Sequence, residues 1–164
     1  MSLKEILLAE FAQETALTRK MLEKVPFDDP QWKPHEKSMT MQRLSSHIAE
    51  IPLWANRTLE SDEYDFATAK FERFFAADNT ELLRKFQETS ASAAALLKEV
   101  TEEKLLSKWS LKRSGQIIYS IPRVGVLRNY VFSHTAHHRG QLSVYLRLNN
   151  ISVPGMYGPS ADEK

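Results

Sequence analysis

The chain has 164 residues, and its 42% hydrophobic and 26% charged content fits one globular domain with a sizeable core. Lysine and arginine (22) nearly balance aspartate and glutamate (21), which argues against a nucleic-acid partner, because phosphate binding is driven by a clustered basic surface. Cysteine is absent, so any metal must be bound through nitrogen and oxygen rather than thiolate ligands.

The chain also lacks the signals of a membrane or secreted protein. No apolar stretch approaches the roughly 20 residues that span a bilayer. The start of the chain, residues 1–5, lacks the basic and apolar segments of a secretory signal. We therefore expect a cytoplasmic protein with no membrane partner, formed by a single domain over residues 1–164.

Two amphipathic helices are predicted in the first part of the chain. The first covers residues 2–24, begins with a capping-box pattern at Ser2 and stops before Pro26. The second covers residues 40–59. Pro52 lies inside it and should kink it, because proline lacks an N–H donor and clashes with the preceding turn.

The middle of the chain contains an aromatic connection and a third helix. Residues 61–78 are too apolar for a free linker, so we expect them to form a long crossover that packs against the helices. The third helix starts near Asn79 or Thr80, both good caps, and its buried face extends to Leu97. A short helical turn is expected at residues 101–106.

The last part of the chain predicts a small hairpin and a fourth helix. Residues 108–111 and 116–121 are β-prone and flank a turn sequence. The fourth helix begins near Pro122 and continues to about Leu148, and the tail from Ile151 should be irregular. Four helices joined by a long crossover predict an all-α four-helix bundle, with this hairpin before the last helix.

Three of the five histidines lie close together in the fourth helix. His134 and His138 are separated by four residues, so they project from one helical face and can chelate one ion. They also fall on the apolar seam of the helix, and two buried neutral imidazoles need polar partners. A metal ion would satisfy both rings at once.

The other histidines carry weaker signals. His47 lies at the flank of the buried face of the second helix and could supply a third ligand if the two helices face each other. The alternative for His47 is a structural role, because a core histidine is usually satisfied by a carbonyl or hydroxyl. His137 is expected at the surface or beside the ligands, and His35, in a loop, is expected to be exposed.

Four segments of the sequence resemble the DinB-like (DinB/YfiT) superfamily of metal-dependent enzymes. They are Trp32–Thr40, Leu44–Ile48, His134–Gln141 and Val153–Ser160. The resemblance covers nearly the whole chain. It implies an up-up-down-down four-helix bundle, often a homodimer, with one divalent metal ion held by three histidines, which map onto His47, His134 and His138.

Three histidine ligands leave at least one coordination position open, which is typical of a catalytic metal site. Zinc or nickel would suit three imidazoles. Two carboxylates are candidates for catalytic proton handling. Glu14 lies in the apolar face of the first helix, and Glu50 is one turn from His47 and could orient its ring. The simpler role for each is an ion pair with an arginine.

The resemblance implies a small-molecule substrate and two chemistries. One is hydrolysis by metal-bound water, and the other is the transfer of a low-molecular-weight thiol that binds the open metal position. The family name refers to induction by DNA damage, which concerns gene regulation and not DNA binding. Two other functions stay open: a metal-binding protein without catalysis, and a structural dimer whose histidines form a polar network.

Overall fold

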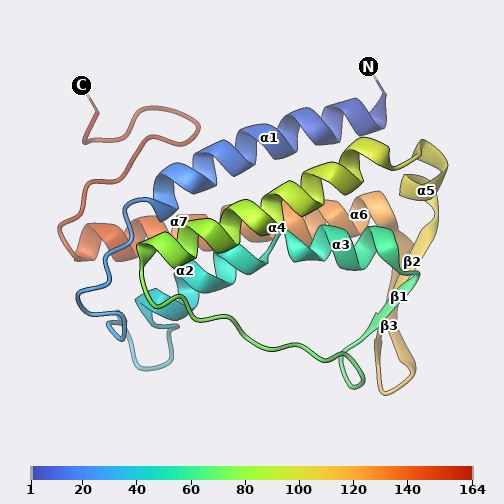
Figure 1. Cartoon of the computed structure of the whole chain (residues 1–164), viewed down its shortest axis with the longest axis horizontal. Helices are drawn as coiled ribbons and strands as arrows, with labels where there is room; N and C mark the ends of the chain where they lie inside the picture. Colours follow the sequence, from blue (N-terminus) through green and yellow to red (C-terminus); the bar gives the residue numbers. More distant parts are fainter. Residues whose placement is uncertain (1, 164) are drawn as a thin grey trace.

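The computed structural model describes residues 2–163, so Met1 and Lys164, the two ends of the expected single domain, lie outside the described residues. Helices make up most of the molecule, and the strands gather at one end of the helical body (Figure 1). The elements in chain order are α1 (Leu3–Leu22), α2 (Met41–Glu50), α3 (Leu53–Glu60), β1 (Glu63–Asp65), α4 (Asn79–Glu99), α5 (Glu102–Leu106), β2 (Lys108–Arg113), β3 (Gln116–Pro122), α6 (Arg123–Leu127), the π-helical segment η1 (Arg128–Ser133) and α7 (His134–Leu148).

Local capping signals fix where several helices begin. The Ser2 side chain accepts a hydrogen bond from the backbone N–H of Glu5, and the Glu5 carboxylate accepts one from the backbone N–H of Ser2, so the predicted capping box is present. Thr40 caps α2 by accepting from the N–H of Arg43, and Asp78 caps α4. These caps satisfy backbone donors that a helix start otherwise leaves free.

The helix predicted over residues 40–59 is interrupted at its proline. α2 ends at Glu50, and α3 begins at Leu53, directly after Pro52. The predicted kink is confirmed, and its cause is the missing N–H of the proline. α2 packs against α4 and α7, which turns one of its faces toward the last helix of the chain.

The all-α class predicted from the sequence is wrong. The expected hairpin of β2 and β3 forms, but β1, in the crossover, pairs in parallel with β2 and produces a three-stranded mixed sheet of order β1-β2-β3. β1 has only three residues, too few for a readable alternation of apolar and polar positions. Asp65 stabilises its position, since its carboxylate accepts from the N–H groups of Ser114 and Gly115 at 2.9 and 2.6 Å.

The up-up-down-down four-helix bundle is likewise not confirmed, and the chain has a mostly helical fold with a mixed sheet. Of the four long helices predicted, the second is broken at Pro52, and the fourth is continuous from Arg123 to Leu148 with the π-helical segment η1 inside it. The crossover runs from β1 back along the helices to the start of α4 (Figure 1). In residues 2–163, no helix is long and apolar enough to cross a membrane.

Candidate metal centre

The structure brings together the three histidines for which a metal was predicted. His47 comes from α2, and His134 and His138 come from the first turns of α7. The Nε2 atom of His134 lies 2.9 Å from that of His138 and 3.2 Å from that of His47. Within residues 2–163, these three form the one cluster of histidine and acidic side chains with ligand geometry.

A π-helical segment precedes the two histidines of the last helix. The backbone N–H of His134 closes η1 by donating to the carbonyls of Asn129 and Val131. A π turn holds an extra residue, and such turns within helices occur frequently at functional sites. The sequence contains no local signal for this turn.

Burial keeps the three rings neutral. Burial, together with the smaller effect of the neighbouring histidines, lowers the pKa of His47 to about 3 and that of His138 to about 4. Burial also lowers the pKa of His134. Neutral imidazole is the form that donates a lone pair to a metal. All three side chains are therefore in the ligand form at neutral pH.

Hydrogen bonding orients the ligand nitrogens. The Nδ1–H of His138 donates to the Gln141 side-chain oxygen at 2.7 Å, so its Nε2 carries the lone pair that faces the cluster. The Nδ1 of His47 lies 3.3 Å from the guanidinium of Arg43. The Nδ1 of His134 is buried and has no hydrogen-bond partner among the described residues.

Without a metal ion, no choice of tautomers gives every nitrogen of the three rings a hydrogen-bond partner within residues 2–163. If His47 accepts from Arg43 through Nδ1 and donates through Nε2, then the Nε2 lone pairs of His134 and His138 face each other at 2.9 Å. The reverse arrangement points the Nδ1–H of His47 at a donor of Arg43. One divalent cation would accept all three lone pairs, and two nitrogens bound to a tetrahedral zinc lie about 3.3 Å apart. The donor set therefore fits a metal ion.

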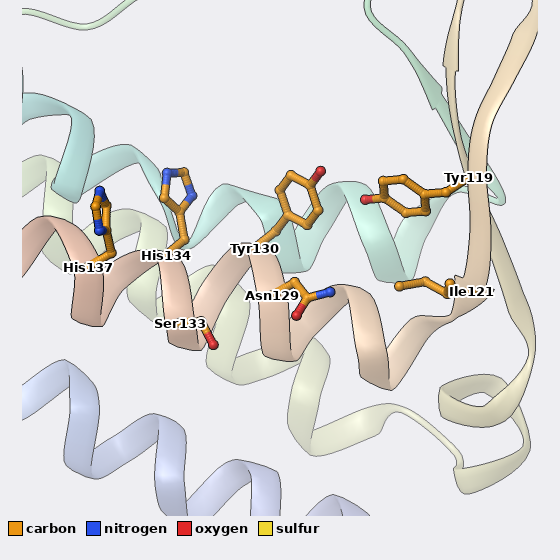
Figure 2. Close-up of a pocket in the computed structure, with 7 residues that line it drawn as sticks. All are labelled: Tyr119, Ile121, Asn129, Tyr130, Ser133, His134 and His137. Carbon is orange, nitrogen blue, oxygen red and sulfur yellow. The ribbon is translucent and has the colours of Figure 1, made fainter.

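Two pockets open beside the cluster. One has a volume of about 500 Å³ and is lined by His47, His134, Trp54 and Tyr130, together with charged side chains. The other, of about 650 Å³, is lined by His134, His137 and Tyr130. Figure 2 shows these last three side chains on one side of the helix, with Tyr119 reaching toward them from β3. A small molecule can therefore approach the histidines from solvent.

The comparisons with known proteins agree with this fold. A family model described as the DinB family matches residues 1–164. The chain belongs to the DinB family. It is 26% identical over 148 residues to the uncharacterized protein YjoA of Bacillus subtilis (strain 168), covering 86% of this chain and 87% of that protein. The uncharacterized protein YrdA of the same organism is also 26% identical, over 156 residues, covering 92% and 85%.

Two solved structures of DinB-like proteins have a similar fold. One, from Bacillus cereus ATCC 10987, has a TM-score of 0.70 and 19% identity, covering 92% of this chain and 95% of that one. The other, YjoA from Bacillus subtilis, has a TM-score of 0.68 and 22% identity, covering 96% and 97%. At these identities the likeness supports the fold alone.

The two carboxylates predicted for proton handling in this DinB-family protein are both paired with arginines. Glu50 is buried, and its two oxygens accept from Arg43 at 2.9 Å and from the N–H of Phe74 at 2.8 Å. Glu14 accepts from Arg139 at 2.6 Å and lies in a separate hollow that none of the three ligand histidines lines. Glu50 thus lines the pocket without a free oxygen, and Glu14 is not brought to the cluster.

The remaining histidines differ in their relation to the site. His35 is exposed, as predicted, and its Nδ1 accepts from the N–H of Lys37. His137 is exposed, lines the wider pocket and lies 4.8 Å from His138 between ring centroids. The expected surface position of His137 is confirmed.

The sequence reasoning missed the arginines of the narrower pocket, Arg57 and Arg73. Arg57 stands one turn after Trp54 on α3, which is a weak signal for a stacked pair, but its other aromatic neighbours come from the crossover. Trp54 is half-buried and contributes to the pocket wall.

Proposed function

We propose that this DinB-family protein is a metal-dependent enzyme in which His47, His134 and His138 hold one divalent cation, zinc or nickel. The observation that carries the proposal is the convergence of three neutral Nε2 atoms beside a cavity of about 500 Å³. Structural zinc sites have four protein ligands, whereas catalytic sites have three and keep one position for water or substrate.

The chain's own residues prepare this site in defined ways. Gln141 fixes which nitrogen of His138 faces the cluster. Trp54 and Tyr130 contribute aromatic rings to the wall of the narrower pocket. A divalent ion bound here would supply Lewis-acid chemistry and would lower the pKa of a bound water or thiol.

Of the two chemistries implied by the family resemblance, the lining of the narrower pocket supports thiol transfer. Hydrolysis needs a base to take a proton from water, and the one carboxylate of the narrower pocket, Glu50, has both oxygens engaged. A thiol ionises with a pKa of roughly 8.5 without such a base, and nearby cations lower it further. In this reaction a sulfur–carbon bond forms, the bond to the leaving group breaks, and the thiol proton passes to solvent.

Hydrolysis is the second candidate, and His137 is the observation in its favour. This exposed imidazole lies in the wider pocket beside His134 and could take a proton from an attacking water. The proposal also keeps the small-molecule partner, the cytoplasmic location and the homodimer expected from the sequence. Light scattering tests the dimer, because a monomeric mass would contradict it.

Elemental analysis of the purified full-length chain tests the metal site. We expect about one divalent ion per chain, and loss of that ion when His47, His134 and His138 are all replaced by alanine. His35→Ala is the matched control, because His35 is an exposed histidine outside the cluster. A triple variant that retains its metal would show that the proposed ligands are wrong.

Activity assays with and without chelator test the catalytic part. The panel pairs low-molecular-weight thiols with electrophiles and includes simple esters. We expect thiol transfer that stops on chelation and returns with zinc or nickel. Turnover that chelator leaves unchanged would contradict the metal-dependent mechanism.

A further inference from the structure

The narrower pocket carries more positive charge than its carboxylate balances. Arg43, Arg57 and Arg73 line it together with Glu50. Arg43 forms the ion pair with Glu50, at 2.9 Å. Among the ion pairs and hydrogen bonds of residues 2–163, none involves the guanidinium of Arg57 or Arg73. Two cations therefore face the pocket without a bound anion.

Aromatic rings hold Arg57 in place. Its guanidinium carbon lies 4.9 Å from the ring centroids of Trp54 and Phe71, and 5.3 Å from that of Tyr64. A guanidinium that stacks on rings through its faces leaves its in-plane N–H donors free for hydrogen bonds. Burial lowers the pKa of Arg57 below its ordinary value, which reflects a cation that has lost water without gaining an ion-pair partner.

Packing alone does not explain this arrangement. The guanidinium of Arg57 is half-buried, and an acceptor in the pocket would satisfy the donors that no protein group among residues 2–163 engages. A carboxylate matches the planar fork of arginine with two parallel hydrogen bonds. The cavity, at about 500 Å³, is in the size range of small-molecule sites, and its wall is largely aromatic.

We propose that the substrate of this pocket is a small carboxylate with an apolar body, whose carboxylate binds Arg57, with Arg73 adding charge, and whose body packs against Trp54 and Tyr130. The opposite end of such a molecule reaches His47 and His134, which line the same cavity. The assignment of that end to the reaction rests on the proposed function. The binding of the carboxylate by Arg57 does not require the metal.

Calorimetric titration of the full-length chain with naphthalene-2-carboxylate and with its uncharged analogue, naphthalene-2-carboxamide, tests this assignment. The wild-type protein should bind the acid about tenfold or more tightly than the amide. Arg57→Gln should abolish that preference and leave the affinity for the amide unchanged, and Arg57→Lys should restore it in part. Arg113→Gln is the matched control, because Arg113 also lies over an aromatic ring, that of Phe66, but does not line this pocket.

Each outcome is decisive for the carboxylate site. If Arg57→Gln weakens both probes equally, Arg57 only shapes the pocket, and the proposal is overturned. A preference for the acid that survives Arg57→Gln but disappears with chelator assigns the carboxylate to the metal, which overturns this inference and leaves the proposed function intact. A preference that depends on Arg57 and persists after chelation supports the inference, and it does so even if elemental analysis overturns the proposed function.

Discussion

The side-chain amide of Gln141, which is not itself a ligand, determines the tautomer of the ligand His138. It accepts the Nδ1–H of His138 at 2.7 Å and so selects the tautomer whose Nε2 lone pair points at the other two rings. Loss of such a hydrogen bond typically weakens metal binding by about 10–100-fold. We therefore expect Gln141→Leu to weaken zinc binding by about that factor, measured by competition with a chromophoric chelator.

The control for this substitution is Gln13→Leu, which changes an exposed glutamine of α1. It should leave the affinity for zinc unchanged. Equal affinities of Gln141→Leu and the wild type would mean that Gln141 does not orient the ligand.

At the level of residues, the sequence predicted the histidine pair better than its surroundings. The four-residue spacing of His134 and His138 fixes their common face on any helix. The approach of His47 depends on how α2 packs against α7, and its proximity to the pair was a conditional prediction. Arg57 was missed because two of its three ring partners, Tyr64 in β1 and Phe71 in the coil that follows, lie in the crossover, whose path no local pattern reveals.

Among the secondary-structure elements, one buried arginine joins the end of α3 to the sheet. The guanidinium of Arg123 donates to the carbonyls of Thr58, Ser61 and Lys108 and to the hydroxyl of Ser107. Replacing it by leucine would leave these acceptors unsatisfied in the interior. We expect Arg123→Leu to lower the free energy of unfolding by about 3 kcal/mol, measured by urea denaturation.

Arg128→Leu provides the comparison for Arg123. Arg128 is exposed and forms a surface ion pair with Glu10. Surface pairs contribute about 0–1 kcal/mol, so this variant should unfold at nearly the wild-type urea concentration. If the two variants lose similar amounts of unfolding free energy, the hydrogen bonds of Arg123 between α3 and the sheet do not stabilise the fold more than a surface ion pair does.

Helix ends and breaks were predictable where one residue determines them, and other elements were not. Ser2 and Pro52 act through local backbone chemistry, so the capping box and the kink are confirmed. β1 pairs with β2, which lies about 45 residues later in the chain, and η1 follows no capping residue or proline that marks it. The pairing of β1 depends on contacts between distant residues, which periodicity along the chain does not report.

For the whole molecule, the neutral histidines make stability depend on pH. An unfolded histidine has a pKa near 6.5, whereas burial lowers the pKa of His47 to about 3 and that of His138 to about 4. Below pH 6.5 the unfolded chain binds protons that the folded chain does not. The free energy of unfolding should therefore decrease as the pH is lowered below 6.5. The limit is about 1.4 kcal/mol per pH unit for each histidine.

Urea denaturation of the chelator-treated protein between pH 7 and 4.5 measures this slope. His47→Asn should flatten it, because the variant lacks one of the three histidines whose pKa is lowered. His35→Asn, at an exposed histidine, should keep the wild-type slope. An unchanged slope in His47→Asn would assign the acid sensitivity of the fold to other groups.

The prediction of an all-α four-helix bundle was wrong because it rested on the number of amphipathic helical segments. Four amphipathic segments predict a bundle, yet the order and pairing of the elements also depend on the crossover, which contributes β1 to a sheet. That pairing is parallel to β2 and joins residues 63–65 to 110–112, a separation over which the sequence carries no register information.

The crossover also separates two properties that could change independently during evolution. The histidines lie on α2 and α7, whereas two of the rings around Arg57, those of Tyr64 and Phe71, come from the connection between α3 and α4. Loops accept substitutions and insertions more readily than helices. Members of the family could therefore acquire new substrates by altering this one loop while the ligand-bearing helices, and the reaction they support, stay the same.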